Sequence, residues 1–254
     1  MNYPQYSIVI PAYNEAARIT NALESVVGCI RSHGWNAEVV VVDGGSRDET
    51  APIVRQFAAR EPRIRLLQNP GNRGKGYSVR NGMLQSLGEI VMFTDADLSA
   101  PIEEAEGLFS ALAAGADIAI GSRWLERTRQ TIRQPLYRQF FGRCFNAVTR
   151  MIMGLPFADT QCGFKMFTHA AAQAIFGRLR RYGPDAPLVV GPMVTAFDVE
   201  VLFMARKLGY RISEVPVLWE HGSGSKVRPF VDTVRMVRDV LLVRWNDLQG
   251  RYRG

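Results

Sequence analysis

An α/β fold with a mostly parallel central sheet is the fold class that the first 120 residues predict. Short apolar runs alternate there with longer segments whose apolar residues recur at helical spacing, which is the pattern of strand and helix units. Residues 39–42 are all valine, as suits a central strand covered by helices on both faces. A chain of 254 residues, 47% of them hydrophobic, can form one substantial core, so we expect a single domain over residues 1–254.

The elements of the sheet follow in order from these apolar runs. The predicted strands are residues 6–12, 37–43, 63–68, 88–95 and 117–122. Between the first two strands, Ile19, Leu23 and Val26 begin an apolar stripe at helical spacing that continues to Ile30. Similar stripes predict further helices within residues 47–60, 76–87 and 102–114.

The alternation ends after Ser122. Residues 123–157 are rich in arginine and aromatic side chains, and a helix is predicted over residues 136–153, with Gly154 and Pro156 ending it. The remaining predicted elements are a strand within residues 163–167, a helix after it, and closing helices at 198–208 and 229–248.

Positive charge is concentrated in one segment. The formal net charge is +7, and seven arginines lie from Arg123 to Arg150 against the single acid Glu126. This cluster predicts an anionic partner such as a phosphate, a phospholipid or a nucleic acid.

The cysteines and the apolar runs indicate where in the cell the protein is expected. Three cysteines without a C-x-x-C pair favour a reduced compartment over a disulfide framework or a zinc site. The first 15 residues lack the features of a secretion signal, and the longest uncharged run is too short to span a bilayer. We therefore expect a cytoplasmic protein whose contact with a membrane, on the cytosolic face, is peripheral.

Acidic side chains follow three of the predicted strands. Glu15 comes after the first, Asp43 ends the second, and Asp95 and Asp97 follow the fourth. In open parallel sheets the strands end at one edge, where ligands bind, so these groups are expected to converge. Oxygen ligands alone match Mg²⁺ or Mn²⁺, and a metal-bound nucleotide diphosphate would explain the pair. Either Asp95 or Asp97 taken singly would also suit a helix cap or a turn.

Lys75 stands in the glycine-rich stretch "NPGNRGKGYS". The stretch is not a P-loop, because Gly76 stands where that motif has serine or threonine. Lys75 would suit contact with a phosphate or a pyrimidine, and it would equally suit an ordinary turn before a helix.

The chain resembles the inverting family 2 glycosyltransferases, which have the GT-A fold. The stretches that carry this resemblance are "SIVIPAYNE", "VVVVDGGSRDET", "GNRGKGYSVRNGM", "FTDADLSAP" and "GSRW". The later stretches "DTQCGFKMF", "AFDVEVLFMARKLGYRISEVPV" and "GSKV" are similar to dolichyl-phosphate beta-glucosyltransferases, with dolichyl-phosphate mannose synthases as more distant relatives. The resemblance implies a half that binds a nucleotide sugar, residues 1–122, and an acceptor-binding, membrane-facing half, residues 123–254.

The same resemblance assigns site residues. It implies that the nucleotide is held by Pro11, Tyr13, Glu15, Asp43, Asp95 and Ala96, and Lys75 joins this set as the candidate from its own glycine-rich stretch. Asp97, with Asp95, would bind the metal. Ser99 stands where the mannose synthases have a glutamine ligand, and Glu220 stands where they have an arginine, which favours the glucosyl branch.

Positive side chains are expected to hold the anionic acceptor. A phosphate monoester is largely ionised at neutral pH and can attack without a base, so it needs a cation to hold it. We expect Arg123 and Lys226 to bind acceptor or donor phosphate, with Arg133 and Arg138 as weaker candidates. Asp159 could orient the acceptor, act as a base or cap a turn.

Aromatic and basic residues are mixed along the predicted helix 136–153, with Tyr137, Phe140, Phe141 and Phe145 beside three arginines. This mixture suits a position on an anionic bilayer, where a lipid acceptor resides. The helix would also suit a buried core or the interface of a homo-oligomer. The last helix, 229–248, would either extend the membrane surface or close the core.

The leading interpretation is therefore an inverting transferase that moves glucose from UDP-glucose to a polyprenyl phosphate. The nearest alternative is transfer of mannose from GDP-mannose. A nucleotidyltransferase is disfavoured, because "PAYNE" replaces the expected glycine- and arginine-rich loop after the first strand. A nucleic-acid binder would explain the arginines but not the acidic loops, so no nucleic-acid partner is expected.

Overall fold

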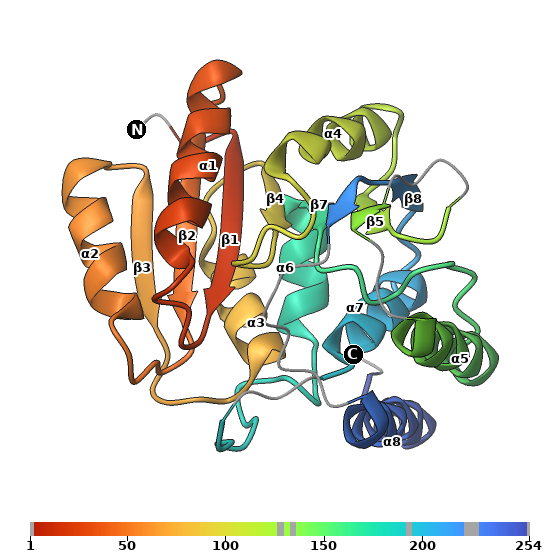
Figure 1. The fold of residues 1–254 in the computed structure, drawn as a ribbon. Coiled ribbons are helices and arrows are strands. Elements are labelled where there is room, and N and C mark those ends of the chain that lie inside the picture. Colours follow the sequence, from red (N-terminus) through yellow and green to blue (C-terminus); the bar gives the residue numbers. More distant parts are fainter. Residues whose placement is uncertain (1–2, 126–129, 133–135, 192–194, 221–228, 253–254) are drawn as a thin grey trace.

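The computed structural model describes residues 3–125, 130–132, 136–191, 195–220 and 229–252. Within these ranges the side chains are described except for residues 130–132, 136–141 and 229–231. Helices cover both faces of one central sheet (Figure 1).

Seven strands form the sheet, in the order β3-β2-β1-β4-β7-β5-β8. They are β1 (Tyr6–Ala12), β2 (Ala37–Asp43), β3 (Ile64–Gln68), β4 (Ile90–Phe93), β5 (Ile118–Ser122), β7 (Lys165–Thr168) and β8 (Ile212–Pro216). Every neighbouring pair is parallel except the two that involve β7. A separate pair of short strands joins β6 (Gln130–Ile132) to β9 (Trp219–Glu220). The prediction of a mostly parallel sheet is confirmed.

Two apolar cores lie on the two faces of the sheet. One core packs the sheet against α1 (Ile19–Ser32), α2 (Thr50–Arg60), the 3-10 turn η1 (Ile102–Glu104) and α4 (Ala105–Ala113). The other packs it against α3 (Lys75–Gln85), α6 (His169–Gly177) and α7 (Phe197–Lys207), with α5 (Leu136–Met153) and α8 (Pro229–Leu248) outside them. Each valine of β2 is fully buried, as the all-apolar run predicts.

The ends of the outer helices match the punctuation in the sequence. Helix α5 stops before Gly154, which has a φ of +66°, a left-handed conformation that glycine adopts at helix ends without strain. Helix α8 begins at Pro229, whose fixed φ suits the first helical position. None of the helices within the described ranges is both long and apolar enough to cross a bilayer.

The reversed direction of β7 matters for the site. Strands β1, β2, β4 and β5 all run the same way and end at one edge of the sheet. Because β7 lies antiparallel between β4 and β5, it begins at that edge. Residues 159–164, which precede β7, are therefore brought to the edge where Asp95 and Arg123 follow β4 and β5.

Candidate active site

An open cleft of about 240 Å³ lies at this edge of the sheet. It is lined by Pro11, Ala12, Tyr13, Glu15, Arg18, Gly44, Asn72, Gly74, Lys75, Ser78, Asp95, Ala96, Asp97 and Gly191. Seven of the residues that the sequence assigns to nucleotide or metal are thus brought together: Pro11, Tyr13, Glu15, Lys75, Asp95, Ala96 and Asp97.

Asp43 is the nucleotide candidate that is not among the lining residues, although its neighbour Gly44 is. It ends β2, opposite Ala12 of β1, and is buried. Its carboxylate accepts hydrogen bonds from the backbone N–H of Ser46 at 3.0 Å and from the amide of Gln68 at 3.4 Å. In this position Asp43 holds the loop that follows β2.

The loops after β1 and β2 are joined by hydrogen bonds. The backbone N–H of Asn14 donates to the Ser46 hydroxyl at 2.9 Å, and that of Glu15 donates to the Thr50 hydroxyl at 2.8 Å. Asp48 accepts from the Thr50 hydroxyl at 2.5 Å. Burial disfavours the charge of Asp48, but the hydrogen bonds from Thr50 outweigh it and lower its pKa. This side of the cleft is therefore pre-formed from two adjoining loops.

Lys75 begins α3 and forms an ion pair with Asp95 inside the cleft. Burial works against the lysine charge, but the carboxylates of Asp95 and Asp198 outweigh it and raise the pKa of Lys75. The ammonium also lies 5.6 Å from the centre of the Phe197 ring. Lys75 therefore stays charged inside the cleft.

Asp97 offers carboxylate oxygens to the cleft. One oxygen accepts the backbone N–H of Ser99 at 3.0 Å, and the other lies 4.0 Å from the guanidinium of Arg18. Arg18 is itself held by Glu15 at 2.8 Å. Among the described residues no group of three metal-ligating side chains occurs. Two carboxylates without histidine or cysteine fit Mg²⁺ or Mn²⁺, which take their remaining ligands from diphosphate and water.

Gly163 packs directly against Asp95. A Cβ atom at position 163 would lie 2.3 Å from a carboxylate oxygen of Asp95, well inside contact distance. A side chain at position 163 would have to displace the Asp95 carboxylate, so the segment before β7 is fitted against the carboxylate of the cleft.

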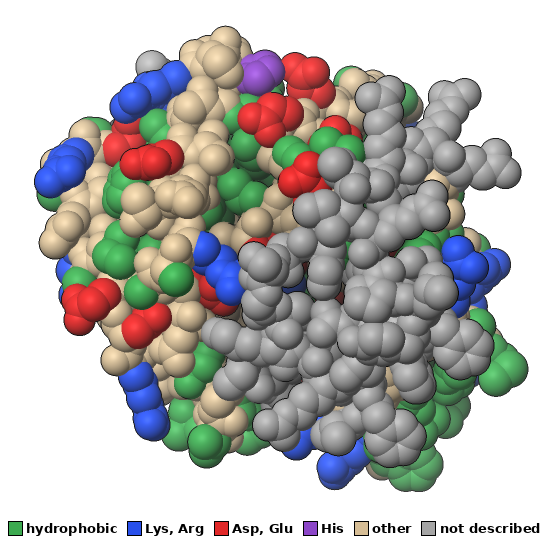
Figure 2. All heavy atoms as spheres, viewed as in Figure 1, with side chains coloured by type: hydrophobic (Ala, Val, Ile, Leu, Met, Phe, Trp, Pro, Cys, Tyr) green, Lys and Arg blue, Asp and Glu red, His purple; other side chains and the backbone are tan. Residues whose placement is uncertain are grey.

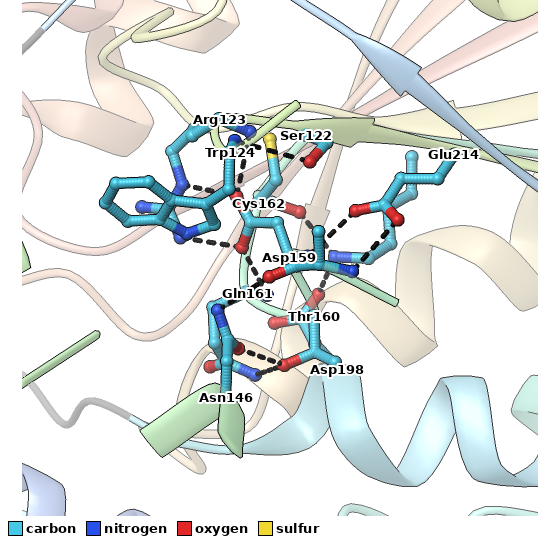
Figure 3. A network of polar contacts seen from close by, with 12 residues as sticks. Ser122, Arg123, Trp124, Asn146, Asp159, Thr160, Gln161, Cys162, Asp198 and Glu214 are labelled. Atoms are coloured by element: carbon cyan, nitrogen blue, oxygen red, sulfur yellow. Dashed lines mark hydrogen bonds and ion pairs between the residues drawn. The ribbon is translucent and has the colours of Figure 1, made fainter. Parts of the chain in front are cut away.

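Arg123, which follows β5, is bound by Asp159 through two parallel hydrogen bonds (Figure 3). The guanidinium nitrogens donate at 2.6 and 2.9 Å, and the Arg123 backbone N–H adds a third bond at 3.0 Å. Burial alone would raise the pKa of Asp159, but the charge and hydrogen bonds of Arg123 lower it. A fully buried carboxylate that is kept ionised in this way is suited to holding Arg123, and poorly suited to accepting a proton.

The loop that carries Asp159 is held from two sides. Glu214 of β8 accepts the backbone N–H groups of Ala158 and Asp159 at 2.9 and 2.8 Å. Asn146 of α5 donates to the carbonyl of Ala158 at 3.0 Å and accepts from the Thr160 hydroxyl at 3.0 Å. The position of Arg123 is therefore fixed by strand β8 and helix α5 together.

Two tryptophans alternate with two arginines next to this network. The Arg123 guanidinium lies 5.6 Å from the Trp219 ring and 5.8 Å from the Trp124 ring, and that of Arg143 lies 5.3 Å from Trp124. Such cation–π contacts hold cations in place without neutralising them. Asp159 compensates the charge of Arg123, and Arg143 brings a second arginine next to this pair.

An ion pair between Lys165 and Asp198 is a feature of the site that sequence reasoning missed. Lys165 is fully buried in β7, where its ammonium donates to Asp198 and to the carbonyl of Cys162. Burial raises the pKa of Asp198, and the neighbouring lysines oppose that rise. The signal was present in the sequence, because a lysine inside the apolar run "GFKMF" requires a buried partner.

Several residues that the sequence predicts for phosphate or membrane contact lie outside the described part of the chain. They are Lys226 and Arg133, together with the side chains of Tyr137, Arg138, Phe140 and Phe141. Their assignment to phosphate or membrane stays a prediction.

Known proteins resemble this chain along most of its length. The model of glycosyl transferase family 2 matches residues 7–176. The chain is 32% identical to the dolichyl-phosphate beta-glucosyltransferase of Saccharomyces cerevisiae, over 97% of this chain and 76% of the yeast protein. It is 31% identical to the enzyme of the same name from Dictyostelium discoideum, over 96% and 75% of the two chains.

Solved structures agree on the fold. Glucosyl-3-phosphoglycerate synthase from Mycobacterium tuberculosis, in complex with Mn²⁺, UDP and glucosyl-3-phosphoglycerate, has a TM-score of 0.62 at 22% identity, covering 98% of this chain and 80% of that one. A mannosyltransferase from Pyrobaculum calidifontis, in complex with GDP-Man and Mn²⁺, has a TM-score of 0.58 at 20% identity, covering 98% and 65%. These likenesses confirm the predicted GT-A fold. With the family model, the two relatives and the fold in agreement, the chain belongs to glycosyl transferase family 2.

Proposed function

We propose that this glycosyltransferase moves glucose from UDP-glucose to a polyprenyl phosphate of the dolichyl type, with inversion at the sugar, to give a beta-linked lipid-phosphate sugar. The observation that carries the proposal is the closeness of an acid-lined cleft to Arg123, a partly buried arginine that Asp159 holds in place. The relatives named for dolichyl-phosphate glucosylation, which align with nearly the whole chain, support the choice of sugar and acceptor.

One short segment connects the two places. Gly163 contacts Asp95 in the cleft, and Asp159, four residues earlier, holds Arg123. Four residues span at most about 14 Å even when fully extended. Donor and acceptor groups held at these two places would therefore lie within reach of each other.

The donor side would be held by the loops of the cleft. Pro11, Tyr13 and Glu15 would line the nucleotide, with Asp43 holding the adjoining loop. Asp97 and Asp95 would hold Mg²⁺ or Mn²⁺, which supplies positive charge to the departing diphosphate. Lys75, which is paired with Asp95, would contribute positive charge toward the diphosphate.

The acceptor side needs positive charge more than it needs a base. A phosphate monoester with a second pKa near 6 is already ionised at neutral pH. Arg123 would position an oxygen of the acceptor phosphate for attack on the anomeric carbon. The attack would come from the face opposite the leaving diphosphate, which inverts the configuration. Asp159 would keep the guanidinium in place, and Lys226 stays a candidate for a second phosphate contact.

Transfer of mannose from GDP-mannose is the second candidate. The mannosyltransferase solved in complex with GDP-Man and Mn²⁺ shares the fold, which supports keeping a mannosyl donor as the alternative. The sequence feature that favours glucose is Glu220, an exposed residue that stands where the mannose synthases have an arginine.

A single assay tests both candidates. Purified protein would be incubated with radiolabelled UDP-glucose or GDP-mannose, Mg²⁺ or Mn²⁺, and a polyprenyl phosphate, and the label in the lipid phase would be counted. Of the two donors, we expect only UDP-glucose to give a lipid product. The coupling constant of the anomeric proton in that product should show the beta configuration. Label transfer from GDP-mannose alone would replace the glucosyl assignment, and no lipid product from either donor would refute the acceptor class.

A further inference from the structure

The outer side of α8 carries four large apolar side chains, whereas the outer side of a surface helix is ordinarily polar. Val234, Leu241, Trp245 and Leu248 are each more than half exposed. They follow one another at intervals of seven, four and three residues, so they lie on one face of the helix. Four large apolar side chains on one exposed helix face need a covering.

The charges of α8 are divided between its two sides. Arg235 and Arg238 are exposed. Asp232 and Asp239 are buried, and Asp239 is paired with an arginine and a tyrosine that precede α7. Asp247 is paired with a lysine of α7 and an arginine of its own helix. The acids of α8 are thus taken up on the protein side, and the exposed side keeps arginine.

Helix α5 packs against α8 and extends this surface. Arg143, Arg150 and Met151 of α5 are exposed, and the helix contains no aspartate or glutamate over its whole length. Figure 2 shows hydrophobic side chains gathered at the lower right with basic side chains nearby, in the part of the view where Figure 1 places α5 and α8. We call the exposed side chains of α5 and α8 the α5/α8 face.

The α5/α8 face reaches the proposed acceptor site. Arg143 lies 5.3 Å from the Trp124 ring, and Trp124 in turn lies 5.8 Å from the guanidinium of Arg123. A lipid whose chain is embedded beside this face would therefore have a short path for its phosphate to Arg123.

We infer that the α5/α8 face binds the surface of an anionic lipid bilayer. Exposed aliphatic side chains and a tryptophan insert at the level of the headgroups, and arginines attract anionic lipids, so both features of the face are satisfied together. A second copy of the chain is a poorer occupant, because a twofold contact would set the arginines of one face against those of the other. The choice of a bilayer rests in part on the lipid-linked acceptor proposed above.

Co-sedimentation with vesicles tests the inference directly. Wild-type protein should bind vesicles of phosphatidylcholine with phosphatidylglycerol at least tenfold more tightly than vesicles of phosphatidylcholine alone. The double variant Leu241→Ser, Trp245→Ser should lose at least tenfold in affinity for both vesicles. The charge reversal Arg235→Glu, Arg238→Glu should remove the preference for phosphatidylglycerol.

Matched controls separate the face from a general effect of exposed residues. Leu87 is 50% exposed, close to the 52% of Leu241, and Leu87→Ser should bind vesicles as the wild type does. Arg60 is exposed at the end of α2, and Arg60→Glu should keep the preference for anionic vesicles. Equal losses in these controls would overturn the inference, as would a wild type that binds neither kind of vesicle. A dimer in sedimentation equilibrium that the Leu241, Trp245 variant dissolves would assign the face to a second copy instead.

Assays with two acceptors, one in vesicles and one soluble in water, distinguish failure of this inference from failure of the proposed function. The Leu241, Trp245 variant should lose transfer to a long polyprenyl phosphate in vesicles but keep it toward a short, water-soluble prenyl phosphate. A wild type that binds anionic vesicles yet glucosylates neither acceptor would refute the proposed function and leave the membrane face standing. Loss of transfer to both acceptors in the variant would contradict a role confined to membrane binding.

Discussion

Two ion pairs at the same edge of the sheet differ in burial. In the cleft, the side chains of Lys75 and Asp95 are 33% and 36% exposed. Beside β5, Arg123 is 17% exposed and Asp159 is not exposed at all. An ion pair open to water contributes about 0–1 kcal/mol and separates easily, whereas separating a buried pair leaves a charge without a partner. Lys75 and Asp95 can therefore separate and each contact another charged group. Arg123 is instead kept in one place by Asp159.

The largest expected effect is on stability, from removing the buried carboxylate. Asp159→Ala should lower the free energy of unfolding by about 3–5 kcal/mol, because Arg123 loses its buried counter-charge. Asp95→Ala should change it by no more than about 1 kcal/mol. Urea denaturation followed by circular dichroism would measure both. Similar losses in the two variants would remove the distinction between the pairs.

The next largest effect is on catalysis, from replacing Asp97 in the cleft. Asp97→Asn should lower kcat/KM at least about 100-fold, roughly 3 kcal/mol of transition-state stabilisation, with little change in stability. Glu89→Gln is the matched control, because Glu89 is exposed and precedes β4, at the opposite end from Asp97. Steady-state assays over a range of Mn²⁺ concentrations would show the loss. An Asp97→Asn variant with wild-type turnover would exclude Asp97 as a metal ligand.

A smaller effect is expected from replacing Lys75, the lysine of the cleft. Lys75→Gln should raise the KM for the nucleotide sugar about tenfold, about 1.4 kcal/mol, and leave the KM for the acceptor unchanged. Lys207→Gln removes a lysine that is also paired with an aspartate, but in α7 and away from the cleft, and should change neither constant. A rise confined to the KM for the acceptor would contradict the assignment of Lys75 to the nucleotide sugar.

The smallest effect is a difference in pH dependence. Arg123 lowers the pKa of Asp159 below its ordinary value in the folded chain, so the pair stabilises the fold fully above the unfolded pKa, near 4. That stability should disappear as the pH falls from about 4 through the lower folded pKa. The gap in unfolding free energy between the wild type and Asp159→Asn should therefore be constant above about pH 5 and narrow below about pH 4. A gap that widens toward low pH would contradict the direction of the shift.

Much of the fold follows from local pattern. The valine run predicts β2, and Gly154 and Pro229 mark the ends of α5 and α8, whose structural bounds equal the predicted ones. Strand β8 was not predicted, because it is an edge strand whose residues are all only partly buried and it lacks an apolar run. The reversed direction of β7 could not be predicted either, since it depends on how distant segments pair.

The candidate site divides in the same way. Residues that follow strands, such as Glu15 and Asp97, could be placed at one edge by the parallel sheet alone. The bond between Arg123 and Asp159 joins positions 36 apart, and nothing local in either segment indicates it. For that reason local pattern could only assign Arg123 to phosphate and leave Asp159 among three roles, whereas the folded chain joins them.

The missing side chain of Gly163 has a wider consequence. Because one added methyl group would collide with Asp95, the loop before β7 would act, under the proposed function, as a spacer that sets how far the two substrates stand apart. Acceptor preference would then be altered through α5, α8 and the residues after β5, with this spacing left as it is. Engineering a new acceptor should begin at those helices and leave the spacer alone.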